Sequence, residues 1–303
     1  MYNFKKNAKA YIVTSDASPQ QHQIDIYPDL SASQTFDEQS YKRKTLHTQN
    51  HMHEFAVVNN ANPANFSFTT PIPNSGSTPI ILALGGTYST ITSNMVSFDL
   101  YIESDNVIYK LQKCVIESLA FNIEMNSVLT VSVSGTASKL VKFGNVGAVT
   151  IPGTVNTFTR SYAKIDSLTV KIGGSTLDSI TAAHFDIKND VTWYQNNTIN
   201  EAVAGTMMYP GAYSLQGRTF SGSITQFLTS ENLDLISDTS TTSSIIISMY
   251  YNTYSTTTAL LEFNLPSTVF TRRLNFDELI NRVYDFRLNS NPTIPVKPIY
   301  KGV

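Results

Sequence analysis

The sequence predicts a mainly β protein, an antiparallel sandwich or barrel-like fold with one short flanking helix. Apolar and polar residues alternate along Cys114–Gly135 and, more loosely, along Lys164–Asp190, as they do in strands with one buried and one solvated face. Charged residues make up only 15% of the 303-residue chain and aromatic residues 11%, while Ser, Thr and Asn fill many polar positions. This composition is typical of a β protein with much of its surface in contact with other molecules.

The stretch Cys114–Gly135 predicts a β-hairpin. Leu119, Phe121 and Ile123 share one face of its first strand, and a polar turn at Glu124–Ser127 leads into a second strand with the same alternation. The polar residues of the opposite face are Asn122, Glu124, Thr130, Ser132 and Ser134. We therefore expect one face of this hairpin in the core and the other in water.

The stretch Lys164–Asp190 predicts a second hairpin. Leu168, Val170 and Ile172 alternate before a turn at Gly173–Gly174, and alternation resumes on the expected return strand. The return strand carries Phe185 and Ile187 as apolar positions, and the polar face of the hairpin carries Thr169, Lys171, Asp186 and Lys188. Both hairpins begin with an apolar, an acidic, a Ser and a Leu residue, so the chain is either internally duplicated or shows the chance likeness of two strands.

The remaining elements follow in chain order. Residues 1–75 predict an N-terminal arm and loops with short strands, the clearest near Ala10–Val13, and residues 76–303 predict the main β domain, with 76–150 and 151–303 as its halves if there are two. Further strands are expected at Pro79–Gly86, Val96–Ile102, Val107–Leu111, Arg218–Leu228, Ser243–Tyr251, Ala259–Leu265 and Arg282–Leu288. Residues 59–79 are expected to be loops around at most one short strand, at Phe66–Phe68, and residues 194–217 to be a loop.

The best candidate for the helix is Ser230–Ile236. Ser230 or Thr229 can cap its free amides, and Glu231 and Asp234 lie near the positive end of the helix dipole. Asn275–Val283 is the alternative helical segment.

The net charge, the cysteine count and the distribution of apolar residues limit the classes of protein to which this chain can belong. The net charge is −2, so the sequence lacks the concentration of Lys and Arg that grips nucleic-acid phosphates. Cys114 is the only cysteine, which excludes an intrachain disulfide. The N-terminus lacks the apolar segment of a signal peptide, and no apolar run reaches the roughly 20 residues that span a bilayer. We expect a chain made in the host cytoplasm, soluble, with no membrane partner.

The sequence carries no catalytic signature, and we expect neither an enzyme nor a cofactor. A G-x-S-x-G elbow is missing, and His184 is expected to be a polar surface residue of its strand. His47, His51 and His53 form H-x3-H-x-H and would ligate zinc if a bent loop brought the imidazoles together. A solvated loop is the favoured interpretation, so no metal is expected.

Read in order, several segments resemble a bacteriophage tail tube protein of the roughly 300-residue type. They are PIILALGG, the first hairpin with SFDLYIESDNVIYKLQK before it, YAKIDSLTVKIGG, YSLQGRTFSGSITQFL, ALLEFNLPSTVF and RVYDFRL, within about residues 80–290. The resemblance implies a structural protein of the virion tail that stacks in rings around a DNA channel. Six copies per ring are expected, or three of a duplicated fold. Sheath, baseplate, tail terminator and tape measure proteins are the implied partners, with DNA passing transiently.

We expect the polar faces of the two predicted hairpins to line the channel. A lumen that passes DNA should present short neutral or slightly acidic groups, because fixed lysines would hold phosphates. The assigned residues are Asn122, Glu124, Thr130, Ser132, Ser134, Thr169, Lys171, Asp186 and Lys188. The alternatives are a carbohydrate-binding or adhesin-like module, stacking sugars on Trp193-Tyr194 or Tyr250-Tyr251, and, less favoured, a polysaccharide-degrading enzyme.

Overall fold

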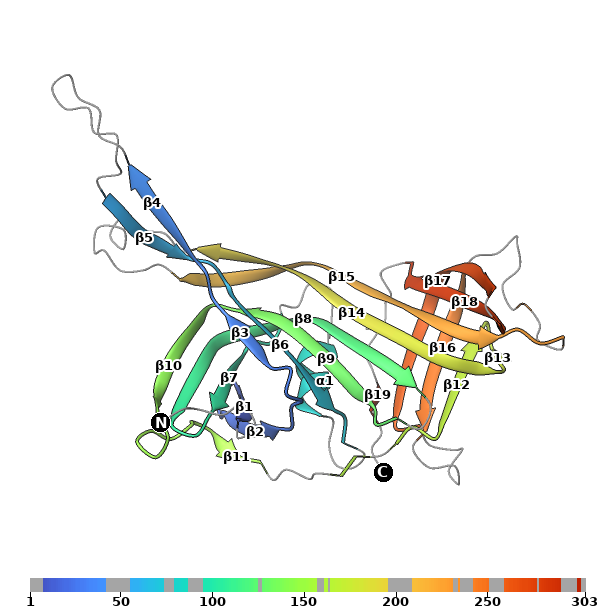
Figure 1. The fold of residues 1–303 in the computed structure, drawn as a ribbon, viewed down its shortest axis with the longest axis horizontal. Helices are drawn as coiled ribbons and strands as arrows, with labels where there is room; N and C mark the ends of the chain where they lie inside the picture. Colours follow the sequence, from blue (N-terminus) through green and yellow to red (C-terminus); the bar gives the residue numbers. More distant parts are fainter. Residues whose placement is uncertain are drawn as a thin grey trace, which may run out of the picture.

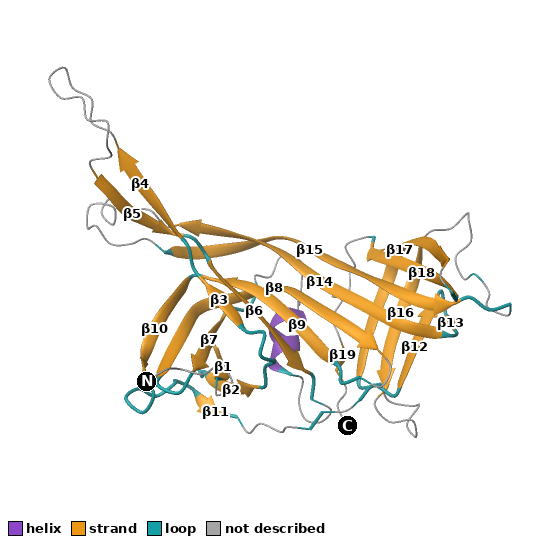
Figure 2. Ribbon diagram, in the orientation of Figure 1, coloured by secondary structure: helices purple, strands orange, loops and turns teal. Residues whose placement is uncertain are grey.

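The computed structural model describes residues 8–41, 55–73, 79–86, 95–124, 127–156, 161–162, 164–195, 209–230, 234, 242–250, 259–276, 278–289 and 299–300. They form a 17-stranded sheet, a separate two-stranded sheet and one short helix, α1 (Ile80–Gly86), which confirms the mainly β class. Among the described strands, all pairings are antiparallel except that of β2 with β11. Figures 1 and 2 show the arrangement.

One long run of strands, the upper sheet, extends across the molecule in Figure 1. At its centre β8 (Val107–Glu124) pairs with β9 (Thr130–Ala137) on one side and with β14 (Ile180–Gln195) on the other. Beyond β9 the sheet continues through β6 (Ala64–Pro71) and β3 (Ser31–Ser33), and beyond β14 through β15 (Pro210–Phe227) and β18 (Ile280–Leu288).

Two smaller groups of strands lie below the upper sheet in Figure 1. The N-terminal group contains the first half of β8 with β7 (Phe98–Glu103), β10 (Lys139–Asn145), β1 (Lys9–Thr14), β2 (Gln20–Ile24) and β11 (Thr154–Val155). The C-terminal group contains the first half of β17 (Leu261–Phe276) with β16 (Thr242–Tyr250), β12 (Ser167–Ile172), β13 (Ser175–Leu177) and β19 (Ile299–Tyr300). The separate hairpin, β4 (Phe36–Tyr41) and β5 (Phe55–Ala61), projects at the upper left.

Strands β8 and β17 each take part in two layers. β8 changes partners near Lys113, a residue with positive φ (56°), whose backbone N–H donates to Asp99 Oδ1 at 2.9 Å. The second half of β17 pairs with β18 of the upper sheet, while its first half pairs with β16 below. Each lower group is thus joined to the upper sheet by continuous backbone.

Aromatic side chains pack between the layers. On the N-terminal side, Phe66 of β6 meets Phe98 of β7 edge to face, with ring centroids 6.1 Å apart. On the C-terminal side, Phe185 of β14 stacks on Phe263 of β17. These rings are almost completely buried, so the core of this two-layered molecule is apolar from one end to the other.

Several predicted strands are confirmed. The hairpin within Cys114–Gly135 is the pair β8 and β9, with Asn122 opposite Thr130. Predicted strands also correspond to β1, β7, β16 and β18. The predicted loops are partly wrong. β6 contains the short strand expected at Phe66–Phe68 but is longer, β5 adds a second strand within 59–79, and the hairpin of β14 and β15 extends into 194–217.

The expected strand at Pro79–Gly86 is wrong, because Ile80–Gly86 is helix α1, whose first turn is closed by the Ala83 N–H donating to Pro79 O at 3.0 Å. Ile81, Leu82 and Leu84 are all buried, and a run that is apolar on every side fits a buried helix as well as a strand. The alternative helix at Asn275–Val283 is also wrong, since the end of β17 and the start of β18 occupy it. The helix expected at Ser230–Ile236 lies outside the described residues except at Ser230 and Asp234.

The second predicted hairpin is half wrong. β12 does turn at Gly173-Gly174, both with positive φ, but its return strand is the short β13. Phe185 and Ile187 lie on β14, which pairs with β8 and β15 instead of β12. The two segments that suggested a duplication also differ in place, since one lies in β8 and the other leads into β12. The duplication stays a prediction, as does a domain boundary at residue 75, across which β1 pairs with β7 and β6 with β9.

Candidate functional site: a polar face of the upper sheet

The outer side of the upper sheet carries two rows of residues, all polar except Ala120, that cross five strands, β9, β8, β14, β15 and β18. Strand register places the residues of each row side by side. One row is Thr130, Asn122, His184, Ser223 and Asp285, and the next is Ser132, Ala120, Asp186, Ser221 and Arg287. We call this surface the polar face.

Period-two alternation produces the polar face. Phe121 and Phe185, which lie opposite each other on β8 and β14, point into the core, so their neighbours Asn122 and His184 point outward. Glycine completes the packing beneath the face, because a Cβ on Gly222 would lie 2.3 Å from His184 O and 2.6 Å from a ring carbon of Phe286. The close approach of these groups therefore requires Gly222.

His184 is the centre of a hydrogen-bonded group on this face. Its Nδ1 lies 2.6 Å from Asn122 Oδ1, and its Nε2 lies 3.0 Å from Asp186 Oδ2, which Lys188 Nζ approaches to 3.9 Å. Both ring nitrogens therefore lie within hydrogen-bond distance of a neighbouring side chain. The contact with Asn122 links β14 to β8.

A shallow depression of about 390 Å³ lies over β14, β15, β18 and the second half of β17. Polar side chains line it together with the apolar Val269 and Phe286; the polar ones are His184, Asp186, Ser221, Ser223, Thr271, Asp285 and Arg287. Small-molecule sites are usually concave and mostly apolar, with a few converging polar groups. This depression is open to solvent, so it lacks the enclosure that is typical of a small-molecule site.

The structure brings seven of the nine predicted lining residues to the polar face. They are Asn122, Glu124, Thr130, Ser132, Ser134, Asp186 and Lys188. Thr169 and Lys171 lie instead on β12 in the C-terminal group. Because Val170, which alternates with them, points into the core that also holds Phe185, their side chains face away from the polar face.

The sequence analysis missed the contribution of β15 and β18 to this surface. On β15, Ser221 and Ser223 lie between the buried Phe220 and Ile224, and Gly222 separates the two serines. On β18, Asp285 and Arg287 flank the buried Phe286. The alternation was visible in the sequence. Which strand each residue would lie beside was not, because the partners are far apart in the chain.

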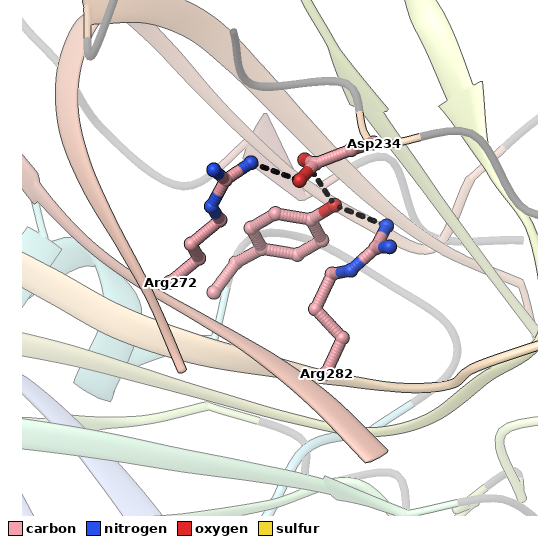
Figure 3. Close-up of polar contacts among 4 residues, drawn as sticks. Asp234, Arg272 and Arg282 are labelled. Carbon is pink, nitrogen blue, oxygen red and sulfur yellow. Dashed lines mark hydrogen bonds and ion pairs between the residues drawn. The ribbon is translucent and has the colours of Figure 1, made fainter. Parts of the chain in front are cut away.

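A second polar cluster lies on the core side of β17 and β18 (Figure 3). Arg282 Nη1 donates to the hydroxyl of Tyr284 at 3.0 Å, and that hydroxyl donates to Asp234 Oδ1 at 3.1 Å. Arg272 forms an ion pair with the other oxygen of Asp234. Burial raises the pKa of Tyr284, which keeps its hydroxyl protonated. The cluster provides hydrogen-bond and ion-pair partners for polar groups at the end of the apolar core, so we interpret its role as structural.

The other candidate residues divide between packing positions and undescribed segments. Trp193 packs on Tyr213 with centroids 5.3 Å apart and donates its indole N–H to Thr136 Oγ1 at 2.8 Å. His47, His51, His53 and Tyr251 lie outside the described residues. Within the described ranges, no three His, Cys, Asp or Glu side chains are grouped to hold a metal ion. No helix there has the length and apolarity needed to cross a membrane.

The described residues form a layered β scaffold with a broad polar face on the outer side of the upper sheet. The chain belongs to the Bacteriophage Baseplate Tube Protein Family, whose family model matches residues 1–297. It is therefore a structural component of the phage tail. The match includes residues 1–75, which the resemblance seen in the sequence did not cover. No curated protein matches the chain.

Proposed function

We propose that this chain assembles with copies of itself into stacked rings, which form a hollow tube that delivers phage DNA into the host. Membership of a baseplate tube family supports a tube, and the layered β fold supplies a rigid wall. The role is structural, with no chemical step. Sheath, baseplate, tail terminator and tape measure proteins are the proposed neighbours in the virion.

The polar face is the observation that carries this proposal. Its residues are mainly hydroxyls, an amide and charges that neighbour opposite charges, such as Asp186 beside Lys188. A wall of this kind gives DNA phosphates few fixed cations to bind. The proposed lining is therefore Asn122, Glu124, Thr130, Ser132, Ser134, Asp186 and Lys188, and excludes Thr169 and Lys171, which face elsewhere.

Strand edges supply a physical reason for ring assembly. Among the described strands, β10 is paired only with β8, and β3 only with β6. Apart from the Leu140 N–H of β10, which donates to Gln34 Oε1 at 2.9 Å, such edges present amides and carbonyls without a strand partner, and a closed ring of subunits can cover them. Six copies are the proposed ring, with three copies as the alternative if the fold is duplicated.

Negative-stain electron microscopy of the full-length chain tests the tube. Hollow cylinders of uniform width are expected, and a protein that stays monomeric at high concentration would refute the proposal. Thiol labelling then tests the lining. Cys114 is buried and its pKa is raised by burial, so a new Ser132→Cys thiol would be the reactive one.

The expected labelling depends on the size of the reagent. A small maleimide should reach Ser132→Cys in cylinders and in monomer, whereas a maleimide on a long polyethylene glycol should react with the monomer alone. The matched control is Ser18→Cys, on the exposed turn between β1 and β2. Equal reaction of the long reagent with Ser132→Cys in cylinders and monomer would place β9 outside the lumen.

A further inference from the structure

The hairpin of β17 and β18 ends in a cluster of exposed apolar side chains. Phe276 is 76% exposed and Leu279 is 61% exposed, and Leu274 and Ile280 are also exposed. We call these four residues the apolar tip. Large apolar side chains scattered singly on a surface need no explanation, but a contiguous group marks an interaction site.

Leu274, Phe276 and Ile280 of the apolar tip continue the core-facing side of their own hairpin, and Leu279 lies in its turn. Phe276 pairs with Ile280, Leu274 pairs with Arg282, and the same side carries Phe270 and Phe286 within the core. The polar cluster of Asp234, Arg272 and Tyr284 lies between these core residues and the apolar tip, and the apolar core ends at this cluster. The tip side chains therefore contribute little to the core of their own subunit, and their exposure needs another cause.

The size of the tip fits one part of a subunit interface. Its four side chains expose on the order of 400 Å² of apolar surface, about half of the roughly 800 Å² that each partner contributes to a standard interface. One such contact would hold two copies weakly. A ring gives every copy two contacts, one through its tip and one through the surface that receives a neighbour's tip.

We infer that the apolar tip docks on a second copy of this chain, against the end that carries Val146 and Val155. This inference rests on the proposed assembly into rings. In Figure 1 the hairpin of β17 and β18 lies at the right, whereas β11, which ends at Val155, lies at the lower left. Val155 is 73% exposed, and Val146 N–H donates to Asn106 O at 3.1 Å, which fixes its loop beside the turn between β7 and β8.

Contact between unlike ends explains how a single surface pair can build a ring. A heterologous contact leaves the same two ends available on each new copy until the ring closes, whereas a tip that bound another tip would stop at a dimer. The apolar tip is therefore assigned to contacts between neighbours in the wall, away from the polar face.

Cysteine cross-linking tests the arrangement. Phe276→Cys and Val155→Cys are made separately in the full-length chain, where the native Cys114 is buried. Under mild oxidation a mixture of the two should form a disulfide dimer that neither variant forms alone. Dimers of Phe276→Cys alone would mean that tips bind tips and would overturn the inference, and so would a mixture without any dimer.

Removal of the apolar surface separates this inference from the proposed tube. The double variant F276S/L279S should need about ten-fold or more protein to assemble than wild type, measured by sedimentation velocity. V96S, which removes another exposed apolar side chain, is the control and should assemble like wild type. If F276S/L279S forms cylinders at the wild-type concentration, the tip assignment fails and the tube stands. If the wild type itself never assembles, both fail.

Discussion

Phe185 of β14 stacks on Phe263 of β17, with ring centroids 4.1 Å apart and ring planes inclined by 27°. The contact joins the upper sheet to the C-terminal group. Phe263→Ala should lower the free energy of unfolding by about 3–5 kcal/mol, because it removes a buried ring and leaves a cavity. Urea denaturation followed by tryptophan and tyrosine fluorescence measures the change. Tyr27→Ala, at an exposed ring, should change it by less than about 1 kcal/mol.

Two glycines of β15 should respond in opposite ways to the same substitution. Gly222→Ala forces a Cβ to within 2.3 Å of His184 O, so backbone must shift and stability should fall by about 1–3 kcal/mol. Gly217→Ala meets nothing within 4 Å and should leave stability unchanged or raise it slightly. Thermal unfolding of both variants checks this. Equal melting temperatures would show that β15 is less closely packed than its register indicates.

Asp234 should stabilise the end of the C-terminal core mainly through hydrogen bonding. Asp234→Asn keeps an acceptor for Tyr284 but loses the ion pair with Arg272, which is partly exposed and screened by solvent, so the loss should be about 0.5–1 kcal/mol. Asp234→Ala leaves Tyr284 without this acceptor and should cost about 1–3 kcal/mol. Chemical denaturation at low and high salt separates the contributions. A wild-type advantage over Asp234→Asn that is insensitive to salt would contradict this account.

Glu117 should make stability depend on pH. Burial raises its pKa, and the hydrogen bond that it accepts from Thr136 Oγ1 at 2.6 Å only partly opposes this. The native state therefore holds a proton more tightly than the unfolded state, so Glu117 lowers stability as pH rises through the range just above its ordinary pKa of 4.5.

Glu117→Gln keeps the acceptor for Thr136 and removes the titrating charge. Its melting temperature relative to wild type should therefore be higher at pH 7 than at pH 4, as calorimetry at the two pH values would show. The control is Glu278→Gln, at an exposed position, which should show no such difference. A Glu117→Gln effect that is the same at both pH values would mean that burial does not penalise the carboxylate.

Local alternation predicted much of the fold. The hairpin of β8 and β9 could be predicted because its strands are neighbours in sequence and its turn is short. The partner of β14 could not, since β14 follows β12 and β13 in the chain yet pairs with β8, whose paired residues lie some 60 positions earlier. Alternation fixes which residues share a face of a strand, and tertiary packing decides which strands lie side by side.

The difference between local alternation and tertiary strand pairing also explains which residues of the candidate site could be predicted. Asn122 and Asp186 were predicted from separate hairpins and do meet on one surface, through the pairing of β8 with β14. Lys171 was predicted from the same pattern, but its strand joined the C-terminal group. The apolar run that became α1 shows the other limit, because uniform hydrophobicity carries no period that separates helix from strand.

The passage of β8 through both layers has a mechanical consequence. A pull on the N-terminal group reaches the centre of the upper sheet through covalent bonds of one 18-residue strand, without first peeling apart rows of hydrogen bonds. The subunit should therefore resist hinging between these parts and transmit a stretching force as a single body.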